Sequence, residues 1–463
     1  MKITKYIIFT YDLISASLIY KLLKEGNTVI VGMVQKAEEM EAEESKEDEK
    51  LRLANYDGIF EKFDAEEVLK IIKNIENKDE WFVYCDFNNL YKYGEACVKM
   101  GFKNGLFPFK EDDELEANRE KAKEIVQKEY PGLKLTQVHQ CQNIEEGKEV
   151  MEQLPDKIFV LKGNYESAKT FVPSSKIPEL ARKQVNDTLE AGKTEYEKEG
   201  FILEEKVNEP LEITPEAMFW NGKLIATTID IENKPLGSGN IGDQTGCSEC
   251  LVFKTNPTDK INRLAFPKFA HDMAKKHPGL FIIDASLLCK GKDYYFGEFC
   301  FNRFGWDSVF NEIMMAGGSV GEFFNKIANG ENPFIYNYGV SVRGFNLPEK
   351  DSGHAFKLEP AEMSWLESVD NNIFCYELKR DAEKKITSLA GSSDLVVVAA
   401  AGNSIKEAVD KTYKAMEGFS FEDLYYRPKS DFNSTDYPTS IPNRYEYGKK
   451  QGFYDNKVIL RLK

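Results

Sequence analysis

The chain begins with an apolar segment, a helical segment and a second apolar segment in direct succession. Residues 5–10 (KYIIFT) and 28–34 (TVIVGMV) are rich in β-branched and aromatic side chains, and residues 15–26 (SASLIYKLLKEG) between them have helical periodicity. A strand that returns through a helix pairs in parallel with the next strand. The strand–helix unit recurs in EWFVYCDF and GEACVKMGF. This order predicts a doubly wound α/β domain that ends near residue 108.

The length of 463 residues exceeds what a single core fills, so we expect about three domains. After the N-terminal domain (1–108), strands joined by tight turns and flanked by helices predict a central domain over residues 109–330. Short strands and one clear helix, SIKEAVDKTYKAMEG, predict a smaller C-terminal domain over 331–428. Residues 429–463 are rich in turn-forming residues, and we expect an irregular tail.

Composition excludes several classes of function. No apolar run approaches the roughly 20 residues of a membrane span, and no cleavage site follows the first apolar segment. The eight scattered cysteines fit a reducing compartment. We therefore expect a cytoplasmic protein without a membrane partner, as a monomer or homodimer. The net charge of −16 argues against a nucleic-acid partner, which needs a concentrated basic face, and favours small-molecule ligands.

A glycine-rich loop at 235–249 (PLGSGNIGDQTGCSE) has Gly237, Gly239 and Gly242 in the spacing G-x-G-x-x-G. A dinucleotide-binding loop needs a strand before it and a helix directly after it. The strand is plausible, but the residues that follow are extended and apolar, with no period of 3.6. We reject the nicotinamide interpretation of this loop, although its spacing keeps a dehydrogenase among the alternatives.

Two further motifs are incomplete. Residues 192–194 (GKT) resemble the end of a phosphate loop, but Asp187 stands where its first glycine is required and no strand precedes it. Cys247 and Cys250 form a C-x-x-C pair, and no second pair of cysteines or histidines lies near it in the sequence. The sequence therefore predicts neither a Walker motif nor a zinc site.

Two carboxylates in the predicted hairpin over residues 280–305 are the most informative acids. Asp284 and Glu298 fall on neighbouring strands, and alternation places Glu298, Cys300 and Asn302 on one face. Carboxylate and amide oxygens facing the same way suit Mg²⁺ that bridges ATP phosphates. Arg303, next along the chain, could stabilise charge on a transferred phosphoryl group. A solvated hairpin with ordinary surface acids is the alternative.

A lysine and three glutamates complete the candidate residues. Lys162 ends an apolar strand, where its ammonium needs an anion or solvent. A phosphate partner and contact with solvent are the two interpretations, and the sequence does not decide between them. Glu204 and Glu205 follow the apolar FIL and would flank an adenine-binding segment, and Glu212 could hold a ribose. Without other evidence, these glutamates would be interpreted as ordinary charged residues of the surface.

Taken in order, these segments resemble the ATP-grasp superfamily, and within it glycinamide ribonucleotide synthetase (phosphoribosylamine–glycine ligase). Residues 237–247 (GSGNIGDQTGC) resemble the family loop G-D-G-D-x-G-P-N-T-G-G. LEANREKAKE resembles its helix L-E-G-S-K-x-x-x-K, with Arg119 and Lys123 at the two lysine positions. IFVLKG, ILEEKV and FGEFCFNRFG resemble its strand V-I-K-x-D-G, its hinge I-E-E-F and its metal strand E-F-N-x-R-F-G. The resemblance extends from about residue 1 to 428.

The resemblance implies an α/β ATP-grasp fold with an N-terminal doubly wound domain and a small C-terminal domain. It implies an ATP-dependent carboxylate–amine ligase of the purine-biosynthesis type, with ATP and Mg²⁺ as cofactors. An amino-acid carboxylate would pass through an acyl phosphate to an amide, with release of ADP and phosphate. The implied catalytic residues are Arg303 and Lys162. The implied nucleotide-binding residues are Arg119, Lys162, Glu204, Glu205 and Glu212. The implied substrate-binding residues are Gly239, Asp243, Thr245 and Gly246, and the implied metal ligands are Asp284, Glu298 and Asn302.

Departures from the family pattern bear on substrate and activity. The metal strand has one extra residue, which puts Cys300 where the family has asparagine, and the phosphate loop after Lys162 has few glycines. These changes keep open a nucleotide-binding protein that has lost ligase activity. The family's N-terminal turn G-G-R-E-H holds a ribose phosphate, whereas FTYDLISASL here has no glycine and carries Asp12. Because Asp12 would repel a phosphate, although Ser15 and Ser17 could donate to it, we expect an amine without a 5′-phosphate.

Overall fold

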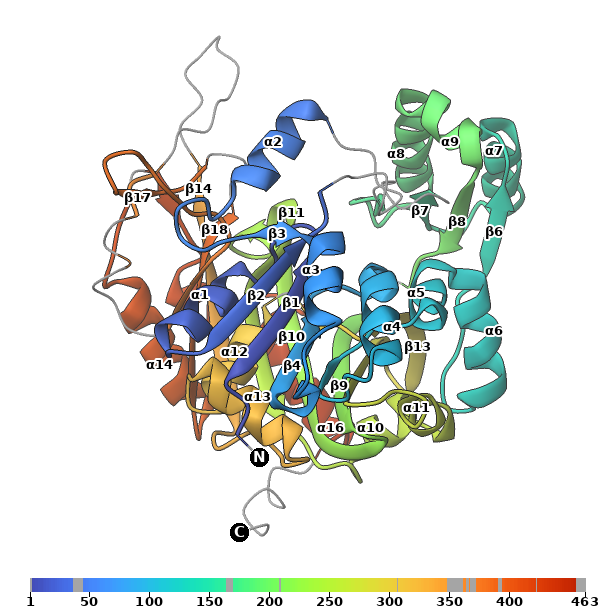
Figure 1. Cartoon of the computed structure of the whole chain (residues 1–463). Helices are drawn as coiled ribbons and strands as arrows, with labels where there is room; N and C mark the ends of the chain where they lie inside the picture. The colour runs from blue at the N-terminus through green and yellow to red at the C-terminus, as the bar shows by residue number, and fades with distance from the viewer. Residues whose placement is uncertain are drawn as a thin grey trace.

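The computed structural model describes residues 2–35, 45–163, 170–207, 210–305, 307–347, 361–363, 366, 372–389, 394–421 and 423–454. One large mixed sheet, with helices packed around it, makes up most of the molecule (Figure 1). A smaller lobe built on a three-stranded sheet stands apart from it and is coloured teal to green in Figure 1.

The N-terminal part of the large sheet is parallel. Its strands are β1 (Lys5–Thr10), β2 (Thr28–Met33), β3 (Phe63–Asp64), β4 (Trp81–Cys85) and β5 (Gly105–Leu106), in the order β5-β4-β1-β2-β3. Its helices are α1 (Ala16–Lys24), α2 (Lys46–Ala54), α3 (Ala65–Ile72) and α4 (Tyr91–Lys99), with short 3₁₀ turns η2 (Lys78–Glu80) and η3 (Asn88–Leu90). Five of the six residues of β1 are buried, as expected for a parallel strand covered on both faces. The predicted doubly wound arrangement is present.

Long antiparallel strands form the centre of the same sheet. They are β9 (Leu211–Trp220), β10 (Lys223–Gly237), β11 (Ile241–Lys254), β12 (Leu280–Lys290), β13 (Asp293–Phe301), β14 (Tyr338–Asn346) and β18 (Asp394–Gly402). Within the described residues the sheet has 14 strands, ordered β15-β18-β14-β11-β10-β9-β12-β5-β4-β1-β2-β3, with β13 on β12 and β19 on β14. Asn221 and Gly222 both have positive φ (48° and 77°), which is the backbone of the predicted tight turn between β9 and β10.

The remaining elements of the main body are short strands and helices. The strands are β15 (Ile373–Cys375), β16 (Lys379–Arg380), β17 (Ile386–Thr387) and β19 (Leu424–Tyr425). The helices are α10 (Lys260–Ala265), α11 (Lys268–Ala274), α12 (Ser308–Met315), α13 (Val320–Ala328) and α14 (Ile405–Met416). α12 and α13 bury apolar residues against the face of the sheet that carries Met218 and Ile282. No helix in the described ranges has both the length and the apolar character needed to cross a membrane.

The small lobe has its own core. Its strands β6 (Val138–Cys141), β7 (Phe159–Gly163) and β8 (Phe201–Glu205) pair in the antiparallel order β6-β8-β7. Helices α7 (Ile144–Gln153), α8 (Pro178–Ala191) and α9 (Lys193–Glu199) cover this sheet. The core includes Leu161, Val185 and Leu203, all fully buried. Since this core is separate from the others, the lobe can pack as a unit against the large sheet.

Two predictions about helices need correction. The segment 114–132 (ELEANREKAKEIVQKEYPG) has the sequence pattern of one amphipathic helix stopped by Pro131 and Gly132. It instead spans parts of two helices, α5 (Lys110–Ala117) and α6 (Arg119–Glu129), because Asn118 leaves the helical conformation and accepts a hydrogen bond from Lys121 N at 3.0 Å as an N-cap. The tail expected to be irregular contains α15 (Lys429–Phe432) and α16 (Ile441–Lys450). Ile441 and Tyr445 of α16 are buried in the main core, and that packing stabilises the helix. The domain boundaries stay predictions.

Candidate functional site

Three acids predicted to bind metal or nucleotide (Glu212, Asp284 and Glu298) fall on one face of the large sheet, together with Ser286 and Cys300; we call it the carboxylate face. Asp284 of β12 is directly opposite Cys300 of β13, and Glu298 is two residues from Cys300 along the strand. The Ser286 hydroxyl donates to Glu212 Oε1 of β9 at 2.8 Å. Ile283 and Phe299, which point the other way, lie in an apolar core. The alternation predicted from the sequence thus brings both carboxylates to one face.

Asn302 does not continue this face, contrary to the predicted alternation. β13 ends at Phe301, and Asn302 follows with a left-handed backbone (φ 48°). Its amide is fully buried and donates to Asp112 Oδ2 at 2.6 Å. Asp112 also contacts His277 Nε2 at 2.8 Å. The amide of Asn302 therefore belongs to a buried hydrogen-bond network, and Asp284 and Glu298 are the predicted metal ligands that share the carboxylate face.

Cationic side chains border the carboxylate face. Arg303 bonds Glu116 through Nε (3.0 Å) and Nη2 (2.9 Å), and its Nη2 donates to Cys300 Sγ at 3.0 Å. Burial raises the pKa of Asp284 well above its usual value, although Arg303 counteracts this effect. Lys234 of β10 lies 3.9 Å from Glu212 and lowers the pKa of that carboxyl. Lys234 is a member of the site that we did not predict from the sequence.

Near this face lies a lobe cluster formed by Lys162 and Glu204 of the small lobe and by Lys123 of α6. Lys123 Nζ of α6 lies 2.7 Å from Glu204 Oε1, and Lys162 at the end of β7 bonds the other carboxylate oxygen. Burial by itself would raise the pKa of Glu204, but the two lysines outweigh it and hold that pKa at about 2. Glu204 therefore stays charged and holds both ammonium groups in place. The predicted anion for Lys162 is, in this structure, Glu204.

The charge of the lobe cluster affects the carboxylate face. The charge of Lys162 helps to lower the pKa of Glu212, although the two residues belong to different sheets. Arg119 begins α6, and its Nη1 has no hydrogen-bond partner among the residues that the structure describes. Glu205 pairs with Lys157 at 2.6 Å instead of joining the lobe cluster. The structure thus brings Lys162 near Glu212 and Arg119 near Lys123, and it places the Glu205 carboxylate elsewhere.

A second set of acids is buried beneath α12, beside the carboxylate face. Glu216, Asp230 and Glu312 have pKa values that burial raises, to about 7 for Glu216. The Glu216 and Glu312 carboxyls share a hydrogen bond, and Thr228 donates to Glu312 at 3.3 Å. These residues were not predicted from the sequence. The pattern that could have indicated them is the one that indicated Lys162, namely an ionisable side chain inside an apolar run such as TTIDI.

The glycine-rich loop is the tip of the β10–β11 hairpin. The loop is followed by the strand β11 and not by a helix, as the sequence predicts. The structure therefore also argues against a dinucleotide-binding loop. The Gly239 amide donates to Asp431 Oδ1 at 2.9 Å, and the Thr245 hydroxyl donates to Lys234 O at 2.7 Å. Gly246 is exposed, and the Asp243 side chain lies outside the described residues. Two of the four predicted substrate contacts therefore already have partners within the chain.

The C-terminal tail supplies the partner of Gly239, Asp431, which forms a tail cluster with Arg427 and Glu249. Arg427 is fully buried, with Nε 3.1 Å from Glu249 Oε2, and it also binds Asp431. Its Nη1 donates to Asn240 Oδ1 of the hairpin tip at 2.8 Å. Arg427 thus ties the tail to the hairpin through several charge-assisted hydrogen bonds.

Helix α16 adds a buried arginine next to the carboxylate face. Arg444 donates to the backbone oxygens of Glu232 and of Glu212 (3.4 Å) and to Asn233 Oδ1 (2.8 Å). Burial lowers the pKa of Arg444, and Glu212 and Glu232 counteract this effect. No sequence signal pointed to Arg444, because it lies in the segment predicted to be irregular. The tail therefore positions part of the site.

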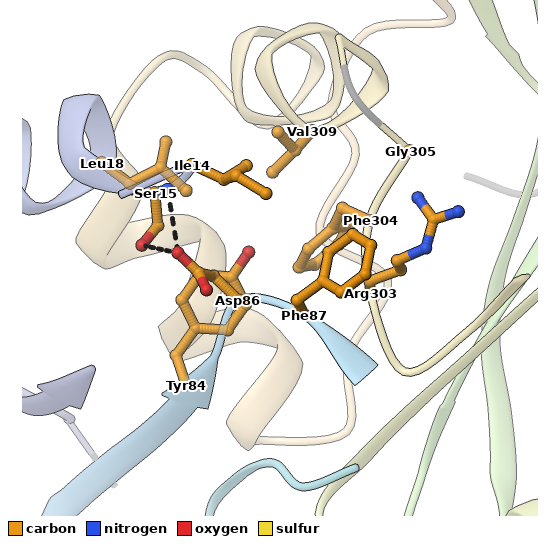
Figure 2. A pocket seen from close by; sticks show the side chains of 10 residues that line it. All are labelled: Ile14, Ser15, Leu18, Tyr84, Asp86, Phe87, Arg303, Phe304, Gly305 and Val309. Atoms are coloured by element: carbon orange, nitrogen blue, oxygen red, sulfur yellow. Dashed lines mark hydrogen bonds between the residues drawn. The ribbon is translucent and has the colours of Figure 1, made fainter. Parts of the chain in front are cut away.

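A pocket opens beside Arg303, where the carboxyl ends of β1 and β4 meet the start of α1 (Figure 2). The empty space between its lining atoms amounts to about 350 Å³, a figure that includes open solvent. Ile14 and Leu18 from the α1 side, and Phe304 and Val309 from the α12 side, line it. Asp86 lies at its floor, with Oδ2 accepting from Ser15 N (3.2 Å) and Ser15 Oγ (2.9 Å).

The acidic side chains suit a metal ion that is shared with a ligand. No three His, Cys, Asp or Glu side chains in the described part of the chain are grouped so that they could hold a metal by themselves. Mg²⁺ at nucleotide sites takes one or two protein carboxylates and completes its shell with phosphate oxygens and water. Asp284 and Glu298 on one face meet this requirement, whereas the Cys300 thiol is a poor ligand for it.

The structure is similar to several solved enzymes. Phosphoribosylamine–glycine ligase from Thermotoga maritima superposes with a TM-score of 0.60 and 16% identity, covering 91% of this chain and 99% of that one. Biotin carboxylase from Campylobacter jejuni, in complex with β,γ-ATP, gives 0.56 and 12%, with 99% of each chain covered. N5-carboxyaminoimidazole synthase from Aspergillus clavatus, in complex with ADP and 5-aminoimidazole ribonucleotide, gives 0.52 and 13%, covering 90% and 100%.

The chain has the ATP-grasp fold. All three similar enzymes belong to this superfamily, so the predicted fold and the resemblance in the sequence are confirmed, as a divergent case. No protein-family model matches the sequence, and no curated protein matches it either. At 12–16% identity the similarity establishes the fold, and the reaction must be argued from the residues.

Proposed function

We propose that the protein is an ATP-dependent carboxylate–amine ligase, related in chemistry to phosphoribosylamine–glycine ligase. The observation that carries the proposal is that an ATP-grasp fold here holds cations on the small lobe and on α6 near carboxylates of the large sheet. Arg119, Lys123 and Lys162 supply the positive side, and Asp284 and Glu298 supply the negative side. A magnesium–nucleotide complex carries the charges complementary to both.

The reaction has two balanced steps. A carboxylate oxygen of the first substrate, an amino acid, attacks the γ-phosphorus of ATP, and the bond to the β–γ bridging oxygen breaks to give an acyl phosphate and ADP. The nitrogen of the amine then attacks the carbonyl carbon. The bond from that carbon to the phosphoryl oxygen breaks, phosphate leaves, and the nitrogen loses a proton to give the amide.

The chain's own residues bind and orient these groups. Lys162 and Arg119 bind phosphate oxygens, and Glu204 keeps Lys162 in position until the phosphates arrive. Glu212, held by the Ser286 hydroxyl, accepts hydrogen bonds from the ribose. Arg303 neutralises charge on the acyl phosphate, and its double contact with Glu116 fixes the guanidinium.

Asp284 and Glu298 would hold Mg²⁺ when nucleotide is bound. The metal would reduce the repulsion between the phosphates and the incoming carboxylate. Glu205, Asp243 and Gly246 stay predicted ligand contacts, and Asn302 has no part in this proposal because its amide is bound to Asp112.

The second candidate is a nucleotide-binding protein without ligase activity. It is favoured by the loss of a third oxygen ligand, since Cys300 occupies the face and Asn302 has turned away. The two candidates agree on nucleotide binding and differ in turnover.

The test is ADP release with Mg-ATP, a panel of amino acids and a panel of amines that includes phosphoribosylamine. Glu298→Gln should lower Mg-dependent ADP formation about 100-fold while leaving the fold intact, because an amide supplies less charge to the cation. Asp293→Asn is the matched control, since that carboxylate lies on the same strand and pairs with Lys134. Mg-ATP binding without turnover would favour the second candidate, and equal turnover in Glu298→Gln would refute the site.

A further inference from the structure

The Asp86 carboxylate has one free oxygen in the pocket of Figure 2. Asp86 is 4% exposed, and its Oδ2 is bound by Ser15, while Oδ1 has no hydrogen-bond partner within the described chain. Burial raises the pKa of Asp86 to about 6, and interactions with Thr10 and Ser15 counteract this effect. A buried carboxylate oxygen that lacks a donor calls for a ligand that brings one.

The rest of the pocket is mostly apolar. Ile14, Leu18, Phe87, Phe304 and Val309 surround the carboxylate with aliphatic and aromatic carbon. A ligand that fills this space gains by burying carbon, and it needs one strong hydrogen-bond donor for Asp86.

The pocket is unsuited to a phosphate group. The amide of Ser15 at the start of α1, which could bind an anion, already donates to Asp86, and the amide of Ala16 donates to Leu13 O at 2.9 Å. The neighbouring cation, Arg303, is paired with Glu116 and lies over the ring of Phe87, with its guanidinium carbon 5.1 Å from the ring centroid. Asp86 therefore holds the place at this helix start that an anion would take.

The pocket also adjoins the proposed reacting centre. Arg303 lines the pocket and, from the same guanidinium, reaches Cys300 on the carboxylate face. Gly305, another lining residue, donates its amide to the buried Glu216 carboxyl. A ligand in the pocket would thus lie beside Arg303, where the acyl phosphate is expected to form.

From this geometry we infer that the pocket binds the amine substrate, and that this amine is a small primary amine with an apolar body and no phosphate. Its ammonium donates to Asp86 Oδ1, and its carbon chain packs against Ile14, Leu18 and Val309. The inference rests on the proposed function, because it assigns one substrate of that reaction.

The experiment measures binding without ATP, so that it is read separately from ligase activity. Primary amines from ethylamine to phenethylamine, together with ribose 5-phosphate and inorganic phosphate, are titrated into the full-length protein at pH 7.5 by calorimetry. At least one apolar amine should bind, and Asp86→Asn should weaken it tenfold or more. Asp12→Asn is the matched control, because that carboxylate is exposed in the same turn and does not line the pocket.

A second variant guards against a folding defect in Asp86→Asn. Val309→Phe should fill the pocket and weaken the amine at least tenfold, while Mg-ATP affinity changes less than twofold. The inference is overturned if no amine in the series binds, if Asp86→Asn binds as wild type does, or if ribose 5-phosphate or inorganic phosphate displaces the amine. Loss of ATP binding with the amine result intact would refute the ligase and leave the pocket assignment standing.

Discussion

The lobe cluster and the tail cluster are both built from opposite charges, yet their side chains differ in exposure. Side chains of the lobe cluster are 10–19% exposed, whereas those of the tail cluster are 0–7% exposed. A cation that still reaches solvent can exchange its carboxylate partner for a ligand at low cost. A fully buried ion pair cannot, since removing one partner leaves an unpaired charge in the interior.

The same difference in exposure separates Lys162 from the glycine-rich loop, although the sequence predicts a ligand-binding role for both. Lys162 lies in the lobe cluster with 19% of its side chain exposed, and it is near Glu212. The glycine-rich loop has its Gly239 amide bound by the tail cluster. A motif that resembles a ligand-binding loop can therefore serve to anchor the chain's own tail, and exposure of the polar groups is what distinguishes the two uses.

The largest effect is expected from Arg427→Met. Glu249, already raised in pKa to about 7 by burial, and Asp431 would lose their cation. Unfolding free energy should fall by about 3–5 kcal/mol, as for other broken buried ion pairs. Chemical denaturation monitored by tryptophan fluorescence measures it. A loss below about 1 kcal/mol would contradict the view that the tail cluster is structural.

Arg444→Met tests a buried arginine that belongs to neither the lobe cluster nor the tail cluster. It should lower the free energy of unfolding by about 2 kcal/mol, because two backbone oxygens and Asn233 lose a charged donor. If α16 also positions Glu212, the KM for ATP should rise while the KM for the amine stays constant. Lys449→Met, an exposed change on the same helix, is the control. Equal changes in both KM values would indicate a purely structural role.

Lys162→Met should act mainly on the ligand. Mg-ATP affinity is expected to fall about tenfold or more, because a charged donor to phosphate is lost. Stability should change little, since Glu204 keeps Lys123 as a partner. Calorimetric titration and thermal unfolding measure the two effects, with Lys157→Met as the control on the exposed side of the lobe. Unfolding with preserved ATP affinity would make the lysine structural.

The smallest effect concerns pH. Glu204 has a folded pKa of about 2, below its usual 4.5, so its contribution to stability is present above pH 4.5 and is lost as the pH falls towards 2. Glu204→Gln should therefore be less stable than wild type at pH 7, and the difference should shrink between pH 4.5 and 2. Urea unfolding at a series of pH values measures it. A difference that does not depend on pH would rule out this ion pair as its cause.

Several elements could be predicted from the sequence because their cause is local. The strands and helices of the N-terminal domain follow from short-range periodicity, and the Asn221-Gly222 turn follows from the ease with which both residues take positive φ. Alternation along β13 placed Glu298 and Cys300 on one face. The ordered series of motifs indicated the ATP-grasp fold, which the similar structures confirm.

Tertiary structure decided which of these residues share a site. Asn302 left the predicted face because β13 ends at Phe301, and the left-handed backbone at Asn302 brings its amide to a buried partner, Asp112, 190 positions away in the chain. Arg444 and Arg427 came into contact with β10 and β11 only through the packing of the tail, which no local pattern indicates. Local propensity fixes the identity of an element, whereas the partner of a buried charge is set by whichever distant group folding brings within hydrogen-bond distance.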